Sequence, residues 1–306
     1  MALIDKLTAI ADAIRGKTGK TEEMTLDQMV TEIDGIQVGG GDDELVTEIL
    51  TGQLSGTYRN DTITKLAGGV SNQDNLYEAY FPNVTTLPTE YAFHNSRRLN
   101  YVSLPKVTAL PICTFVNTGK LSGLEIDIPN LKTIGRHAFE SSGLIRADFP
   151  LVTSLDRCVF LNCGKLEYVN LPCITTIPFQ TGYSGFFSGC SKLVTVNLPK
   201  VETVTNTAFY QCSSLPKLDL PCAKTIGTQA FYFAKVLTTL ILRSDTVCTL
   251  SNTNAFANSP FASNGTGGTV YVPQALIEQY QQATNWSTLY AAGTCNFVAI
   301  EGSEYE

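Results

Sequence analysis

A hydrophobic residue followed by proline recurs at a nearly constant spacing along most of this 306-residue chain. Successive prolines of this kind lie 23, 24, 21, 22, 27 and 22 residues apart, from Pro82 to Pro221. A phenylalanine keeps step with them in eight successive units. Two landmarks that hold register over so many units indicate a repeat array. The phenylalanines are Phe93, Phe115, Phe139, Phe160, Phe187, Phe209, Phe231 and Phe256.

Each unit predicts one short β-strand. Leucine-type residues stand six, three and one positions before the proline, as Leu193, Val196 and Leu198 do before Pro199. This spacing fits a strand whose inward side chains alternate near the proline. A unit of about 22 residues cannot bury its apolar side chains alone, whereas stacked units share one continuous core. The sequence therefore predicts a solenoid.

Side chains two and four positions before each proline are expected to point away from that core. These positions are rich in Asp, Asn and Tyr, which can hydrogen-bond hydroxyl groups and stack on apolar ring faces. Such a surface suits a glycan or a polar protein partner, and the alternative interpretation is a solvated sheet face without a ligand. The candidate binding residues are Tyr80, Tyr101, Ser103, Glu125, Asp127, Arg146, Asp148, Tyr168, Asn170, Asn197 and Asp219.

Two further positions of the repeat carry cysteine. Three residues after the phenylalanine stands a small side chain, including Cys163, Cys190 and Cys212, for which buried packing is the expected role. Two residues before the phenylalanine, Cys113, His137 and Cys158 follow one another. This spacing is not a known ligand signature and no fourth ligand is evident, so the sequence predicts no metal site.

The repeat resembles the BspA-like branch of the leucine-rich-repeat family, in which L-x-x-L-x-L-P is followed by V-T-x-I and A-F-x-x-C. Leu215 to Pro221 and Ala230-Phe231 carry the likeness, as do Leu166 to Pro172 and Ala208-Phe209 with Cys212. The resemblance covers residues 76 to 256 and implies a bacterial surface or secreted protein that binds host proteins. We therefore expect a right-handed, β-rich leucine-rich-repeat solenoid of about eight repeats of about 22 residues, over 76–265.

Both ends of the stack need covering, because an open end would leave apolar side chains and strand edges in water. Residues 44–75 are expected to form a capping or degenerate repeat with Ile63, Leu66, Val70 and Leu76. Residues 266–306 are expected to form a strand-helix cap, in which Trp286 is buried. Val270 to Pro273 would be its strand, followed by an amphipathic helix with Leu276, Ile277 and Tyr280 over the end of the stack.

Residues 1–38 are predicted to be helical, and the glycines within 39–43 to form a flexible linker. Short amphipathic helices of this kind are marginal alone, so we expect them to attach or oligomerise the chain; a cap for the solenoid is the alternative. Leu7 to Gly19 and Leu26 to Met29 resemble an N-terminal element of phage and prophage tail-associated proteins. The predicted attachment residues are Leu3, Leu7, Ile10, Ile14, Leu26, Met29, Val30 and Ile33.

Composition excludes several functions. The net charge is -7 and the longest basic run is Arg97-Arg98, which disfavours nucleic-acid binding. Apolar runs fall short of the roughly 18 residues of a membrane span, and no Sec signal peptide is visible. P-loop, GxGxxG, HExxH and GxSxG motifs are absent, so we expect a non-enzyme without a cofactor.

The leading hypothesis is a phage or prophage tail-associated adhesion protein that recognises a bacterial surface glycan or protein. Its N-terminal helices would attach it to the virion tail or to further copies of itself, which adds avidity. It would be virion-associated, or extracellular after lysis. The alternative is a BspA-like protein of the bacterial cell surface, or a secreted one, that binds host proteins.

Overall fold

The computed structural model describes residues 56–66, 68, 70–178 and 185–306. The predicted helical segment 1–38, the linker 39–43 and all eight predicted attachment residues lie outside the described residues. Of the segment 44–75, the described part begins with strand β1 (Gly56–Arg59). Ile63, Leu66, Val70 and Leu76 are buried, as expected for a degenerate repeat.

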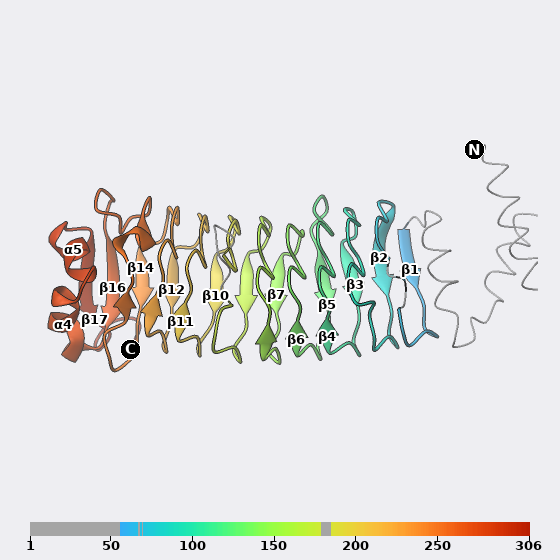
Figure 1. The fold of residues 1–306 in the computed structure, drawn as a ribbon, viewed down its shortest axis with the longest axis horizontal. Coiled ribbons are helices and arrows are strands. Elements are labelled where there is room, and N and C mark those ends of the chain that lie inside the picture. Colours follow the sequence, from blue (N-terminus) through green and yellow to red (C-terminus); the bar gives the residue numbers. More distant parts are fainter. Residues whose placement is uncertain (1–55, 67, 69, 179–184) are drawn as a thin grey trace, which may run out of the picture. The chain divides into compact units, whose positions relative to one another are not determined.

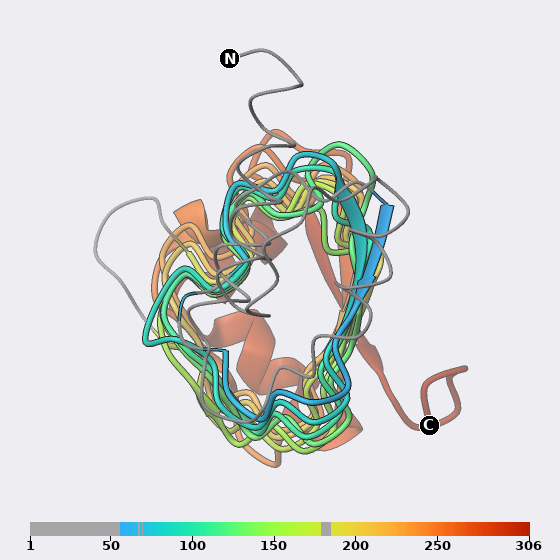
Figure 2. The same cartoon turned by 90° about the vertical axis from the view of Figure 1, so that its right-hand side faces the viewer.

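The described residues form a solenoid of stacked coils, each of which adds one parallel strand to the same wall (Figure 1). Seen from the end of the stack, the coils superimpose as a ring with these strands along one side (Figure 2). The strands of this wall are β1, β2 (Leu76–Tyr80), β3 (Tyr101–Ser103), β5 (Glu125–Asp127), β7 (Arg146–Asp148), β9 (Tyr168–Asn170), β10 (Thr195–Asn197), β12 (Lys217–Asp219), β14 (Thr239–Ile241), β16 (Gly268–Val272) and β17 (Cys295–Ala299).

A second set of short parallel strands follows the proline of most coils, where the sequence has its V-T-x-I segment. These pair in two groups along the stack. They are β4 (Ala109–Leu110), β6 (Thr133–Ile134) and β8 (Ser154–Leu155), then β11 (Thr203–Val204), β13 (Thr225–Ile226) and β15 (Thr249–Leu250).

The stack has about ten turns rather than the predicted eight. The difference arises at both ends, where the landmarks fail. The coil of β1 has no phenylalanine of the ladder, and β16 begins a further turn within the segment predicted as the cap. The coil of β14 also departs from the repeat, because it has Leu242-Arg243 where preceding coils have a hydrophobic residue and proline. Stacking does not need the proline itself, because the inward residues Leu237, Leu240 and Leu242 are all fully buried.

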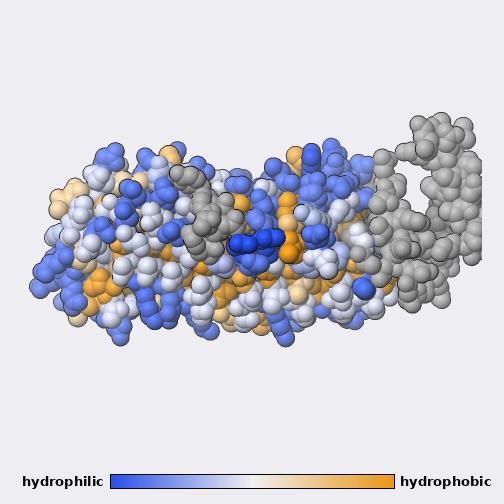
Figure 3. Space-filling model, viewed as in Figure 1, coloured by the Kyte–Doolittle hydropathy of each residue, from blue (hydrophilic) through white to orange (hydrophobic). Residues whose placement is uncertain are grey.

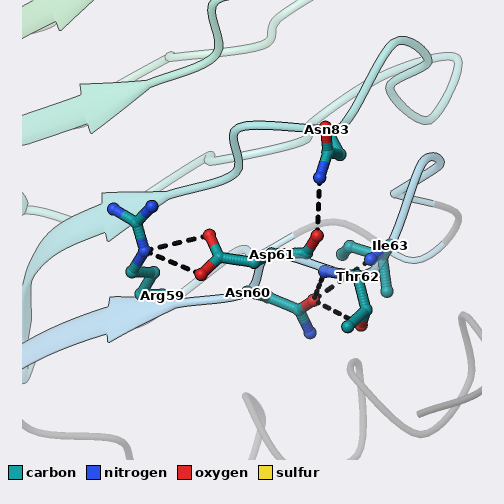
Figure 4. Close-up of polar contacts among 6 residues, drawn as sticks. All are labelled: Arg59, Asn60, Asp61, Thr62, Ile63 and Asn83. Atoms are coloured by element: carbon teal, nitrogen blue, oxygen red, sulfur yellow. Dashed lines mark hydrogen bonds and ion pairs between the residues drawn. The ribbon is translucent and has the colours of Figure 1, made fainter. Parts of the chain in front are cut away.

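The first described turn is fixed by side chains that replace missing backbone partners (Figure 4). The Asn60 Oδ1 atom accepts from the backbone N–H groups of Thr62 and Ile63, at 3.0 and 3.1 Å. Asn83, one coil later, donates its Nδ2 to the Asp61 carbonyl at 2.6 Å. The turn after β1 is therefore joined to the next coil.

The eight predicted phenylalanines form a continuous ladder through the core. All are 0% exposed, and neighbouring rings have centroids 5.0–5.6 Å apart and planes within 18° of parallel. One aromatic ring per coil at this spacing gives each ring two stacked neighbours. The phenylalanines that mark the repeat in the sequence are therefore core residues.

The small residues three positions after each phenylalanine are buried as predicted, and three of the cysteines also serve as hydrogen-bond donors. Cys163, Cys190 and Cys212 donate Sγ–H to the phenylalanine carbonyl of the preceding coil, at 2.9, 3.1 and 3.2 Å. These thiols are free. They thus pack as small apolar groups and satisfy a buried carbonyl at the same time.

Each ladder coil also contains residues in the left-handed backbone region, which the sequence did not reveal. In six of the eight ladder coils they stand both two positions before and two positions after the phenylalanine, as Cys113 (φ 55°) and Asn117 (φ 57°) do around Phe115. Non-glycine residues adopt this conformation at a cost. Hydrogen bonds between coils offset that cost, for example Cys113 N–H to the Arg136 carbonyl at 2.9 Å.

The strand wall is interrupted between β5 and β7 and again between β10 and β12, because the two strands of each pair belong to different sheets. Pro216 stands just before β12, at the position where Val194 in the preceding coil donates its N–H to the Glu167 carbonyl. Proline has no N–H to donate, so it breaks the ladder there. Beside this break Val196 is only half-buried, although the repeat predicts an inward side chain.

The C-terminal cap contains more than the predicted strand and helix. After β16 come a short 3-10 helix, η2 (Gln274–Leu276), and two α-helices, α4 (Ile277–Gln282) and α5 (Trp286–Ala291). Strand β17 follows, pairs with β16 and extends the wall. Trp286 is fully buried and donates Nε1–H to the Cys248 carbonyl at 2.7 Å. Ile277 is half-exposed, so Leu276 and Tyr280 alone cover the core from the first helical turn. A short 3-10 helix, η1 (Thr253–Phe256), precedes the cap.

Within the described residues, no helix is long and apolar enough to cross a membrane.

Candidate functional surface

The outward side chains of the strand wall form a surface that we call the strand face. All eleven predicted binding residues belong to it, and none is buried. Parallel pairing places equivalent positions side by side, so that Tyr101 lies opposite Glu125 and Ser103 opposite Asp127. Figure 3 draws the side of the stack opposite the strand wall, where hydrophilic, intermediate and hydrophobic residues are mixed.

The first part of the strand face joins two tyrosines to carboxylates. The rings of Tyr80 and Tyr101, on neighbouring strands, have centroids 5.3 Å apart. Ser103 Oγ donates to Asp127 Oδ2 at 3.0 Å, and the Tyr80 hydroxyl donates to Glu78 Oε2 at 3.1 Å. Partial burial raises the pKa of both tyrosines, which stay protonated donors at neutral pH. Glu78 was not among the predicted binding residues, although it occupies an equivalent position.

In the middle of the strand face, from β7 to β10, the outward side chains bind one another. The Arg146 guanidinium lies over the Tyr168 ring, 3.5 Å from its centroid, and pairs with Asp148 Oδ2 at 3.1 Å. Asn170 donates Nδ2–H to Asp148 Oδ1 at 2.8 Å. Asn197 donates in turn to Asn170 Oδ1 at 2.7 Å. The hydrogen bond from Asn170, and secondarily Arg146, holds the pKa of the Asp148 carboxyl below its ordinary value.

The last predicted residue, Asp219 on β12, is held by an arginine that the repeat pattern did not single out. Arg243 donates from Nε and Nη2 to the two Asp219 oxygens at 2.9–3.2 Å, a bidentate pair. Arg243 replaces the proline of its coil. That departure from the repeat was the signal available in the sequence.

Cys113, His137 and Cys158 do not form a reactive site. All three are the left-handed turn residues that precede a ladder phenylalanine. His137 Nδ1 lies 2.7 Å from Glu140 Oε2, on its own turn. Burial raises the pKa of both Cys113 and Cys158, which is opposite to what an activated thiol needs. The described part of the chain contains no group of three or more His, Cys, Asp or Glu residues that could hold a metal ion.

A solenoid with one short parallel strand per coil, a leucine and phenylalanine core and an open strand wall defines the leucine-rich-repeat class. The chain belongs to the BspA-type leucine-rich-repeat family, because the model of the BspA type leucine rich repeat region matches residues 70–181 and 179–267. Proteins of this class are generally non-enzymatic binding scaffolds. The match indicates no catalytic family.

A comparison with solved structures finds one with a shared architecture and others with a weaker likeness. A leucine-rich repeat protein from Bacteroides ovatus ATCC 8483 is 18% identical over 83% of this chain and 75% of its own, with a TM-score of 0.53. A leucine rich cell surface protein from Faecalibacterium prausnitzii A2-165 is 19% identical over 74% of this chain and 65% of its own, with a TM-score of 0.45. At these identities the likeness concerns the fold alone. No curated protein matches the chain.

The comparisons support the BspA-like prediction and give no support to the likeness with phage tail-associated proteins. The residues that carried that likeness precede the described part of the chain. The cell-surface or secreted alternative is therefore closer to the findings than virion association.

Proposed function

We propose that this chain is a protein-binding module of a bacterial surface or secreted protein, and that it engages its partner through the strand face. The family supports a protein-binding role. The observation that carries the proposal is the set of eleven outward polar and aromatic side chains, none of them buried, on the parallel strands of one wall. Repeat proteins commonly use such an extended surface for recognition.

The strand face also indicates which partner groups it would accept. Arg146 shows how a guanidinium lies here, over the tyrosine of the neighbouring strand and beside a carboxylate two residues along its own strand. Tyr101 also has a polar neighbour at the paired position, although on the following strand rather than the preceding one: Glu125 lies opposite it on β5, and Asp127 stands two residues along that strand. No Lys or Arg within the described ranges forms an ion pair with Glu125 or Asp127.

We therefore infer that an arginine or lysine of the partner protein lies over Tyr101 and pairs with Asp127 or Glu125. Cation-π contact and a charge-assisted hydrogen bond would act together on one group, as they do at Arg146. A glycan partner would depend more on free amide groups. On this surface, however, Asn170 and Asn197 each donate one Nδ2 hydrogen to a neighbouring side chain.

The test is binding of the fluorescently labelled full chain to intact epithelial cells and to intact bacterial cells. Each cell type is used untreated, after mild trypsin digestion and after periodate oxidation of surface sugars. The proposal predicts binding to epithelial cells that trypsin abolishes and periodate leaves intact. Binding abolished by periodate but resistant to trypsin would contradict a protein partner, and binding to bacterial cells alone would favour the tail-associated hypothesis.

A further inference from the structure

The segment that follows β17, residues 301–306, turns back toward the strand face. Its turn is closed by the Ser303 hydroxyl, which donates to the Ile300 carbonyl at 2.7 Å and accepts from the Tyr305 N–H at 3.1 Å. The Gly302 N–H donates to Glu306 Oε2 at 2.9 Å. Gly302 has a φ of 78°, where a side chain would be strained. These contacts hold Tyr305 in a defined position, and Figure 2 shows this end of the chain on the outer side of the strand wall.

Tyr305 contacts three adjacent strands. Its ring is 4.6 Å from the Tyr271 ring on β16, edge-on at 69°. The Lys217 ammonium of β12 lies 5.4 Å from the Tyr305 centroid. The Thr239 side chain of β14 lies close to the phenol. Lys217, Thr239 and Tyr271 all occupy outward positions of the strand face, so one side chain covers the part of this face that β12, β14 and β16 provide.

The chemistry of these three positions differs from that of the first part of the strand face. They present an ammonium group, a hydroxyl and an aromatic edge, whereas Glu125 and Asp127 present carboxylates. An aromatic ring with a hydroxyl suits the first set, because its face attracts the cation and its phenol reaches the hydroxyl. Glu304 and Glu306, on either side of Tyr305 in the sequence, give this segment a negative charge, opposite in sign to that of Lys217.

We propose that the outward face of β12, β14 and β16 is a subsite for a protein segment that presents a tyrosine between carboxylates, and that residues 301–306 occupy it in cis. A partner segment of the same chemistry displaces this tail when it binds. The inference rests on the proposed function, since it assigns one end of the strand face a preference for such segments.

Displacement is feasible because the tail binds through one ring and a few polar contacts. A tethered group of this kind competes at an effective concentration of roughly millimolar. A free ligand with several contacts along the strand face would overcome that competition. The tail would in turn exclude weaker, non-specific segments.

The experiment uses the full chain and the Tyr305→Ala variant, which leaves every strand-face residue in place. The probe is the peptide Glu-Gly-Ser-Glu-Tyr-Glu, acetylated and amidated at its ends, with the tyrosine replaced by alanine in the control peptide. Binding is measured by ligand-observed NMR. Tyr290→Ala, which removes an exposed tyrosine of α5, is the matched control variant.

We expect the peptide to bind the Tyr305→Ala chain at least ~10-fold more tightly than it binds the unaltered chain or Tyr290→Ala. Adding Lys217→Ala to Tyr305→Ala should weaken that binding, and the control peptide should not bind. Equal binding to all chains, or none to Tyr305→Ala at millimolar peptide with an unchanged melting midpoint, would overturn the subsite. Either of those results would leave the cell-binding test of the proposed function unaffected.

Discussion

Replacement of Phe209 by alanine tests the aromatic ladder on which the stack depends. Phe209 is fully buried, and its ring stacks on Phe187 at 5.1 Å and on Phe231 at 5.5 Å. A buried phenylalanine removes about 150–250 Å² from water, and at about 25 cal/mol per Å² this corresponds to roughly 4–6 kcal/mol. Alanine retains a small part of that, so Phe209→Ala should lower the free energy of unfolding by about 3–5 kcal/mol.

The assay is equilibrium unfolding in urea, followed by circular dichroism. The midpoint should fall clearly, and the cooperativity of the transition should fall with it, because each coil is stabilised by its two neighbours. Tyr101→Ala is the control, since its half-exposed ring lies on the strand face. A midpoint unchanged by Phe209→Ala, or lowered as much by Tyr101→Ala, would refute the assignment of the inward and outward faces.

Three further predictions follow from the described contacts. Trp286→Phe should destabilise the cap by about 1–3 kcal/mol, because it leaves the buried Cys248 carbonyl without its donor; thermal unfolding of the variant measures this, and a melting midpoint equal to that of the unaltered chain would contradict it. A thiol reagent at pH 8 should modify the exposed Cys222 quickly and the buried Cys163, Cys190 and Cys212 only on unfolding. Burial excludes the reagent from these three thiols and raises the pKa of Cys190 and Cys212. Rapid reaction of any cysteine other than Cys222 and the half-exposed Cys113 and Cys173 would contradict the prediction. Asn170→Ala should raise the pKa of Asp148 toward its ordinary value in a carboxyl NMR titration, and a titration curve unaffected by the substitution would exclude Asn170 as the cause of the shift. Because the pKa of Asp148 is lowered in the folded state, its contribution to stability is present above the unfolded pKa and is lost as the pH falls through the folded pKa.

The sequence alone predicts the core well, because a residue's place in the repeat decides whether it points inward. Phe209 and the buried cysteines follow from counting positions around one landmark. The number of coils does not follow, because the coil of β1 and the turn that β16 begins contain no phenylalanine of the ladder. Strand β17 also escapes prediction, because its pairing partner β16 precedes two helices and no landmark precedes the strand itself.

The candidate surface is predictable only as a set of positions. Counting back from the proline identifies Tyr101 and Asp127 as outward residues, and the parallel register then places them on the neighbouring strands β3 and β5. The contacts between these side chains depend on their rotamers and on segments distant in the sequence that pack on the strand face. The stacking of Arg146 on Tyr168 and the return of Tyr305 over β14 are of this kind. The same holds for the left-handed backbone of His137, which is supported by the neighbouring coil rather than by local sequence.

The most direct test of the strand face is a comparison of two full-length variants in the epithelial-cell binding assay. Asp127→Asn combined with Tyr101→Ala removes the proposed cation site on β3 and β5. Glu90→Gln removes an exposed charge outside the strand face and is the control. The account predicts that the first variant binds at least ~10-fold more weakly, equivalent to about 1.4 kcal/mol, with an unchanged melting midpoint. Equal binding by the unaltered chain and both variants would contradict it.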